Sequence, residues 1–278
     1  MLTQMPNSQP DYRQALQSAR RFVRAVQKAG IHLDAAFLYG SYALGTAHEH
    51  SDIDIALVSK DFTGHHRDWQ KIRPALDVDS RIQHVHYRPQ DFRDEHPLVW
   101  EIKTTGISLL GKPRGKYRVD PQRPLQTRWI LRFWTRTAEH HWQTAKVMFQ
   151  VLRYLYALSF GNLYVEALLK AVIVHQTRAH APFRLPLNQL AERANLALTP
   201  AQRNLLARLD TYTIEADAPD HPLGSRKFTR RFCQSELNEM HRFGKRLAML
   251  VKTTGVPLTH NGKRRIAKRR PRRRIKRA

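Results

Sequence analysis

The strongest constraint on the fold of this 278-residue chain is a pair of apolar segments joined by a glycine-containing turn. Residues 33–39 and 53–58 have the length and apolar content of buried β-strands, and Gly40 and Gly45 interrupt the chain between them. An amphipathic helical pattern at residues 11–29 precedes the pair. Together these patterns predict the beginning of a mixed α and β domain.

A linker separates this mixed segment from a helical second half. Short helices are predicted at residues 67–76 and 97–105, and a third strand at 81–87. Residues 111–124 are rich in Gly, Pro and basic side chains, as is typical of a linker. Apolar residues then recur at helical spacing in the segments 125–158, 162–178, 186–196, 200–216 and 226–253.

The predicted fold class is therefore α+β, with a mixed sheet followed by an all-α bundle. The predicted boundaries are a first domain at 1–112, a linker at 113–124, a helical domain at 125–255 and a basic tail at 256–278. The tail cannot bury apolar surface, so we expect it to be disordered without a partner.

The formal charge of +25 points to a polyanionic partner. Residues 263–277 contain eleven Lys or Arg residues and no acid, and the rest of the chain still has 37 basic against 23 acidic residues, or +14. We expect nucleic acid, with RNA favoured, to bind the tail without sequence readout. The tail residues predicted to make these contacts are Lys263, Arg264, Arg265, Lys268, Arg269, Arg270, Arg272, Arg273 and Arg274.

Cysteine usage and hydropathy predict a cytoplasmic protein with no membrane partner. Cys233 is the only cysteine, which excludes an internal disulfide and fits a reducing compartment. No signal peptide is visible at the N-terminus. The apolar runs are short and interrupted, as by Arg153, and none approaches the roughly 20 residues that a spanning helix needs.

The chemistry-bearing residues lie around the turn between the first two strands. A strand ending at Tyr39 leads into Gly40-Ser41, where a helix is predicted to begin. Because a helix start exposes unpaired N–H groups and glycine permits close approach, this corner suits the phosphates of a nucleoside triphosphate. Asp52 and Asp54 alternate with core residues on the next strand, so both carboxylates project to one side.

Two neighbouring carboxylates repel each other unless a cation lies between them. Mg²⁺ (or Mn²⁺) fits, because it accepts carboxylate and phosphate oxygens together. A triphosphate corner beside paired carboxylates predicts metal-assisted nucleotidyl transfer. The alternative is a surface turn followed by a strand with two exposed aspartates.

The motif Gly40-Ser41, ten residues, then Asp52-Ile53-Asp54 resembles the signature of the polymerase-β-like nucleotidyltransferases, in particular their minimal, aminoglycoside-type branch. The similarity covers about residues 11–112. It implies that Gly40, Ser41, Gly45 and Ser51 bind nucleotide and that Asp52 and Asp54 bind metal.

The family adds a third carboxylate on the neighbouring strand, and here that position is Gln83. An amide is a poor metal ligand and no base, so the strength of catalysis is in question. Asp79 lies on the same predicted strand face and is a substitute metal ligand after a shift of register.

Residues 125–255 resemble the HEPN helical domain, through the segments 164–171, 187–192 and 212–220. The Arg and His spacing of ribonucleolytic HEPN domains is absent from the later helices, which argues against ribonuclease activity. Glu166 is a candidate catalytic residue that could accept the proton of the acceptor, and Glu139 is a second candidate. The structural alternative for Glu166 is an i,i+4 ion pair with Lys170.

The sequence thus predicts transfer of a nucleoside monophosphate, AMP from ATP, to a hydroxyl of an anionic acceptor such as tRNA or another nucleic acid. The site is expected in a cleft between the two domains, and the bundle is a candidate surface for homodimerisation. The alternative is a catalytically weak or inactive nucleic-acid-binding or regulatory module that keeps a nucleotide pocket.

Overall fold

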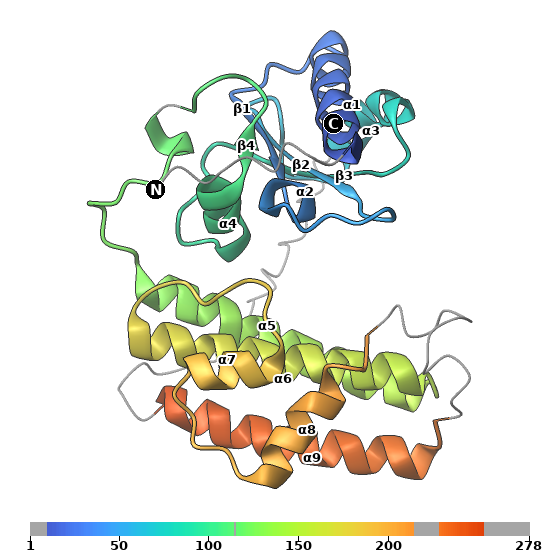
Figure 1. Ribbon diagram of the computed structural model, residues 1–278, viewed down its shortest axis with the longest axis vertical. Helices are drawn as coiled ribbons and strands as arrows, with labels where there is room; N and C mark the ends of the chain where they lie inside the picture. Colours follow the sequence, from blue (N-terminus) through green and yellow to red (C-terminus); the bar gives the residue numbers. More distant parts are fainter. Residues whose placement is uncertain (1–9, 114, 214–227, 253–278) are drawn as a thin grey trace, which may run out of the picture.

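The computed structural model describes residues 10–113, 115–213 and 228–252 (Figure 1). Its first part alternates helices and strands: α1 (Pro10–Lys28), β1 (Ala35–Tyr39), α2 (Ser41–Leu44), β2 (Ile53–Val58), α3 (Arg67–Ile72), η1 (Arg73–Val78), β3 (Ile82–Tyr87), α4 (Pro97–Thr105), β4 (Ile107–Ser108) and η2 (Gly115–Tyr117). Its second part is helical: α5 (Thr127–Gln150), α6 (Tyr154–Thr177), α7 (Leu187–Arg193), α8 (Pro200–Leu209) and α9 (Arg230–Lys252). The predicted fold class is confirmed.

The four strands form one mixed sheet in the order β3-β2-β1-β4. β2 is antiparallel to β1 and parallel to β3, and β4 adds a short antiparallel edge to β1. One face packs on α1, with Phe22 against the layer that contains Ile53 and Ile55. The other face packs on α4, with Ile102 in the same cluster as Phe37. Figure 1 shows α4 on the side of the sheet that faces the helical bundle.

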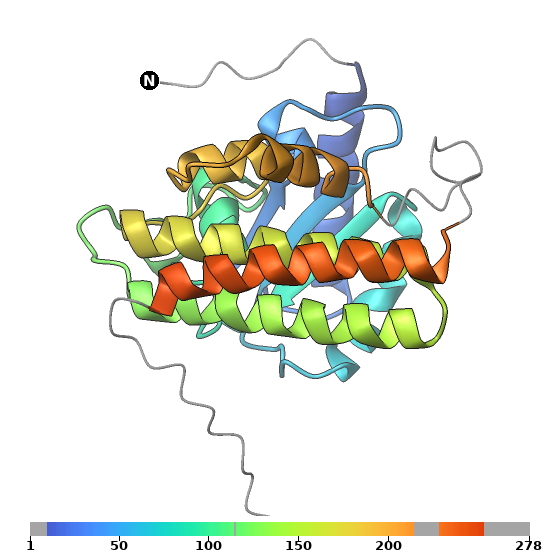
Figure 2. The ribbon, with the colours of Figure 1, turned by 90° about the horizontal axis from the view of Figure 1, so that it is seen from below.

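The long helices α5, α6 and α9 lie side by side and enclose the second core (Figure 2). The predicted break between residues 158 and 162 is wrong, because α6 runs without interruption through Gly161 and the turn falls at 151–153. A Cβ at Gly161 would lie 2.2 Å from the sulfur of Met240. This glycine therefore permits close helix packing and does not mark a helix end.

α6 is the central helix of the bundle. It is the one helix among the described residues whose length and hydropathy would suffice to cross a membrane, and 78% of its most apolar window is buried inside the protein. Its apolar side chains pack on α5, α7 and α9. The sequence pattern therefore underestimated the length of this apolar segment. Its burial in the bundle accounts for its apolar composition.

The two parts of the protein are joined by direct contacts around α4. His180, which follows α6, donates from Nε2 to the carbonyl oxygen of Asp94 at 2.7 Å, and its ring stacks on Trp100 at 4.8 Å. His96 packs its ring against Phe133 of α5 at 5.1 Å. These contacts fix the segment after α6 beside the first domain.

Candidate active site

The two aspartates of the predicted site lie where the sheet faces the helical bundle. In the register of the sheet, Asp54 pairs with Tyr39 on β1 and with Gln83 on β3. Ile53 and Ile55 are buried on the opposite face. The alternation predicted from sequence is therefore present, and Asp54 projects toward α4.

Gly40 brings the chain backbone against the carboxylate of Asp54. Its φ of 74° and ψ of −148° favour glycine. A Cβ at this position would meet Asp54 Oδ2 at 2.1 Å, so any side chain would displace the Asp54 carboxylate. Ser41 begins α2 at the same corner, and Gly45 ends that helix with a left-handed φ of 72°. Because α2 has only four residues, its contribution to phosphate binding is limited to nearby N–H groups.

Ser51 stabilises the loop that leads into β2. Its Oγ accepts a hydrogen bond from the backbone N–H of His48 at 2.9 Å, and its own N–H donates to the His48 carbonyl at 2.9 Å. Ser51 is also buried. These contacts shape the loop before Asp52, and the hydroxyl oxygen is already engaged.

Gln83 lies at the strand position where the resemblance led us to expect an acid. It lies opposite Asp54 in the parallel pair, and its amide Nε2 donates to Asp52 Oδ2 at 2.7 Å. The neighbouring strand therefore supplies a neutral donor that holds Asp52.

Asp79 does not join the aspartate pair. Its carboxylate accepts from the backbone N–H of Arg81 at 3.1 Å and from the Arg81 guanidinium at 3.2 Å. Although burial acts in the opposite direction, hydrogen bonds from Arg81 and Ser18 keep the pKa of Asp79 below its ordinary value. In the part of the chain that the structure describes, no three His, Cys, Asp or Glu side chains form a metal-binding group. The shift of register expected for Asp79 is thus not seen.

Glu166 makes the contacts of the structural alternative. Its Oε1 accepts from Lys170 Nζ at 2.6 Å, and Lys170 also donates to the carbonyl of Phe183 at 2.7 Å. Glu139, the second candidate, accepts from the side-chain amide of Gln143. Both glutamates are therefore engaged within the helical domain, and the predicted basic residues of the tail lie outside the described residues.

The structure adds Glu101 of α4, which was not predicted as a site residue. Glu101 is 8% exposed, and its Oε2 has no hydrogen-bond partner among the described residues. Burial raises the pKa of Glu101, the positive charges of Arg184 and Lys170 oppose that shift, and the negative charge of Asp54 adds to it. A signal was present in the sequence, because Glu101 is the one acid of an otherwise apolar helix start.

Arg184 brings a positive charge from the helical domain to this corner. Burial raises the pKa of Asp54, the Arg184 charge opposes the shift, and Asp52 adds to it. Burial likewise raises the pKa of Tyr39, again against the charge of Arg184. Within the described part of the chain Arg184 forms no ion pair, although it acts on Asp54, Glu101 and Tyr39 together. No local sequence pattern marks it, because only domain packing places it there.

A glycine corner and two carboxylates on the adjoining strand are the features that the sequence predicted for a nucleotidyltransferase, and the helical bundle adds an arginine beside them. Comparison with protein families agrees: residues 24–114 match the family described as polymerase beta, nucleotidyltransferase, and residues 131–261 match the HEPN domain. The chain therefore carries a polymerase β nucleotidyltransferase domain followed by a HEPN domain. The comparison with curated proteins gives no match.

Proposed function

We propose that this protein transfers a nucleoside monophosphate, AMP from ATP, to a hydroxyl group of an anionic acceptor. The observation that carries the proposal is the contact of the Asp54 carboxylate with Gly40, beside Asp52 and under the influence of Arg184. This corner combines the N–H groups at the start of α2 with two carboxylate ligands for a divalent cation. The nucleotidyltransferase family match supports nucleotidyl transfer as the type of reaction.

The residues present fit a divalent cation in part. Asp52 and Asp54 are hard oxygen donors on one face of the strand, and Mg²⁺ commonly binds one or two carboxylates together with substrate phosphates. These two aspartates would hold Mg²⁺ or Mn²⁺, which when bound neutralises developing charge on the triphosphate. The Asp54 carboxylate fills the space that a side chain at Gly40 would take, and phosphate oxygens would approach the N–H groups at the start of α2.

The transfer itself forms one P–O bond and breaks another. The acceptor oxygen attacks the α-phosphorus, the bond to the bridging oxygen breaks, and pyrophosphate leaves. Gln83 cannot take the hydroxyl proton, so we assign that role to Glu101, whose Oε2 is unbonded. Arg184 would offset negative charge on the phosphates as pyrophosphate departs.

The charge of the protein selects the class of acceptor. Without residues 263–277 the chain still carries +14, which repels polycations and attracts nucleic acid. The proposed acceptor is therefore tRNA or another nucleic acid, and the proposed donor is ATP.

A second candidate function follows from Gln83. Because this position holds a neutral amide bonded to Asp52, the protein is alternatively a nucleic-acid-binding or regulatory module that keeps a nucleotide pocket without turnover. The two candidates differ in chemistry but share the polyanion partner.

One assay separates the candidates. The protein is incubated with ATP labelled at the α-phosphate, Mg²⁺ and total RNA, beside the variants Asp54→Ala and Asp77→Ala. Asp77 is an exposed acid in η1 and controls for loss of one negative charge. Label on RNA with the wild type and with Asp77→Ala, but not with Asp54→Ala, supports the enzyme. No transfer by any of the three, with RNA binding intact, supports the module.

A further inference from the structure

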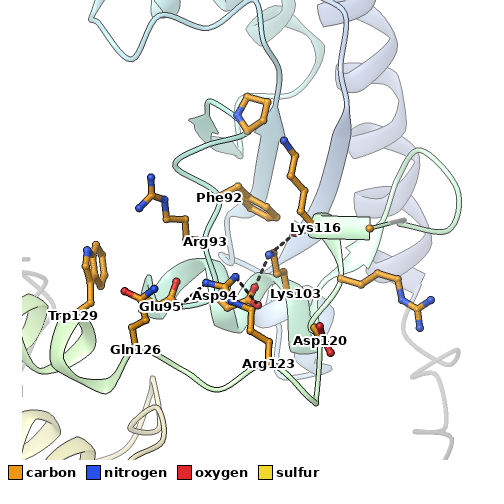
Figure 3. A pocket seen from close by; sticks show the side chains of 13 residues that line it. Phe92, Arg93, Asp94, Glu95, Lys103, Lys116, Asp120, Arg123, Gln126 and Trp129 are labelled. Carbon is orange, nitrogen blue, oxygen red and sulfur yellow. Dashed lines mark hydrogen bonds and ion pairs between the residues drawn. The ribbon is translucent and has the colours of Figure 1, made fainter.

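A second concave site lies around the linker between the two domains. It is a cavity of about 440 Å³ lined by the segment after β3, by α4, by residues 115–126 and by the first turn of α5 (Figure 3). Its volume is in the range of small-molecule sites. None of the residues assigned above to nucleotidyl transfer lines it.

The buried side-chain charges of this cavity, Asp94, Glu95 and Lys103, are neutralised with the help of the exposed Arg123. Lys103 Nζ donates to Asp94 Oδ1 and to the carbonyl of Lys116, both at 2.6 Å. Arg123 pairs with Glu95 at 2.8 Å and with Asp94 at 3.7 Å. Figure 3 shows these groups meeting in the middle of the cavity. Two cations thus balance two carboxylates, and this network adds no net charge.

The remaining charges give the cavity an excess of positive charge. Arg93, Lys116 and Arg118 line it and form no ion pair with any residue that the structure describes. Asp120 is the one further carboxylate in the lining. Arg93 Nε donates to the carbonyl of Gln90, and Lys116 lies over the ring of Tyr117. Three cations without an ion pair, against one carboxylate, favour an anionic ligand.

Trp129 supplies an aromatic surface at the same site. It lies in the first turn of α5, 36% exposed, with its ring stacked on Phe133 at a centroid distance of 6.0 Å. The contact with Phe133 holds the indole in place while part of it stays accessible. Figure 3 shows Arg93 and Trp129 on the same side of the cavity. A flat ring and a guanidinium that line the same cavity are suited to a base with its phosphate.

We propose that this cavity binds one nucleotide of a single-stranded nucleic acid, with the base on Trp129 and the adjoining phosphates on Arg93 and Lys116. The base would stack on the indole, and the cations would contact the backbone without reading sequence. The bound strand would be the acceptor of the nucleotidyl transfer, and in this respect the inference rests on the proposed function. The binding itself requires neither ATP nor Asp54.

The test compares two pairs of substitutions in the full chain. Affinity for a short fluorescent single-stranded RNA is measured by anisotropy over a range of salt concentrations, without ATP. The variant Arg93→Ala/Trp129→Ala is expected to bind about ten-fold more weakly and to lower the slope of log affinity against log salt by about 0.7 for each phosphate that is no longer neutralised. The control Arg73→Ala/Trp69→Ala removes the same residue types from an exposed pair, 5.7 Å apart, on α3 and η1. Its affinity should stay within about two-fold of the wild type.

Further arms keep the result decisive. Arg93→Glu leaves Trp129 in place, so weaker binding by this variant, with unchanged thermal unfolding, supports the proposal even where the double variant unfolds. Wild-type affinity in both Arg93 variants overturns it. Free AMP and unlabelled strand are also compared as competitors of the fluorescent RNA. If AMP displaces the RNA at the same concentration as the unlabelled strand, the proposal is overturned, because the site would then bind a free nucleotide. If Asp54→Ala loses nucleotidyl transfer but still binds the strand, the result supports the proposed reaction and shows that strand binding does not depend on it.

Discussion

The buried charged groups of the helical domain differ in their hydrogen bonding from the carboxylates around Asp54 in the first domain. In the helical domain, Glu236 is bonded by Arg208 at 3.0 Å and by the hydroxyl of Tyr212 at 3.0 Å. Lys170, buried on α6, has both the carboxylate of Glu166 and a backbone carbonyl as acceptors. Each of these charges removed from water is compensated by hydrogen bonds, as a structural role requires.

The corner around Asp54 in the nucleotidyltransferase domain lacks such compensation. Burial raises the pKa of both Asp54 and Glu101, and Glu101 Oε2 has no partner in the described part of the chain. A fold gains nothing from a buried carboxylate that is left unbonded. The contrast indicates that hydrogen-bonded buried charges serve stability, as Asp68 and Asp94 also do in the first domain, whereas the corner around Asp54 keeps two carboxylates ready for a ligand.

The substitution Gly40→Ala should have the largest effect. The φ of 74° is strained for any side chain, and the new Cβ would collide with Asp54 Oδ2. We expect a loss of about 3 kcal/mol in the free energy of unfolding together with loss of nucleotide binding. Chemical denaturation and calorimetric titration measure the two effects. Gly30→Ala, where φ is 88° but no atom lies within 4 Å, separates backbone strain from the collision. Equal losses of stability and of nucleotide binding in the two variants would show that the collision with Asp54 has no effect.

Arg208→Ala should have the second largest effect, and it tests the role of the hydrogen-bonded charges in the helical domain. It leaves Glu236 buried with Tyr212 as its remaining partner, so the free energy of unfolding should fall by about 2–3 kcal/mol. Urea denaturation checks this value. The exposed Arg203→Ala on the same helix is the control, with an expected change within about 0.5 kcal/mol. Similar stability in both variants would show that the buried charges of the helical domain do not serve stability.

The histidines at the domain contact predict how stability depends on pH. Burial lowers the pKa of His96 and of His180, so the folded protein keeps both rings neutral. The unfolded chain takes up these protons near pH 6.5, and stability that is complete above that pH is lost as the pH falls below it. The melting temperature should therefore drop between pH 7 and 5.5, and less so in His180→Gln. A melting temperature that rises on acidification would contradict the sign of the effect.

Glu101→Gln should have the smallest effect on stability and a clear effect on activity. The amide removes a buried charge, so the free energy of unfolding should stay the same or rise by up to about 1 kcal/mol. Nucleotidyl transfer should fall, because the amide cannot accept a proton. Transfer is measured as for Asp54→Ala. A large loss of stability would show that Glu101 is a structural residue.

Sequence patterns predicted the first domain closely because its two central strands, β1 and β2, are almost entirely buried. Continuous apolar runs located β1 and β2, and alternation put Asp54 and Gln83 on one side of the sheet. β4 was missed, since its two residues become a strand only by pairing with β1. The break before α6 was misplaced, because the role of Gly161 depends on a helix distant in sequence.

Only the part of the site that lies in the segment from β1 to β2 was predictable from the sequence. Asp52, Asp54 and Gly40 are close in sequence, so spacing indicated their meeting. Arg184 reaches Asp54 through packing of the two domains, and no local pattern encodes that. Asp79 was predicted as a substitute metal ligand, but its hydrogen bond to Arg81 could not be inferred from its place in the sequence.

Whether Asp54 serves a ligand or the fold is decided by a paired measurement on Asp54→Asn. Calorimetric titration with Mg²⁺ and a non-hydrolysable ATP analogue should give binding in the wild type and none in the variant, while the free energy of unfolding stays equal or rises. Unchanged nucleotide binding, together with a decrease in stability above about 2 kcal/mol, would mean that Asp54 is a structural residue and that the ligand role is wrong.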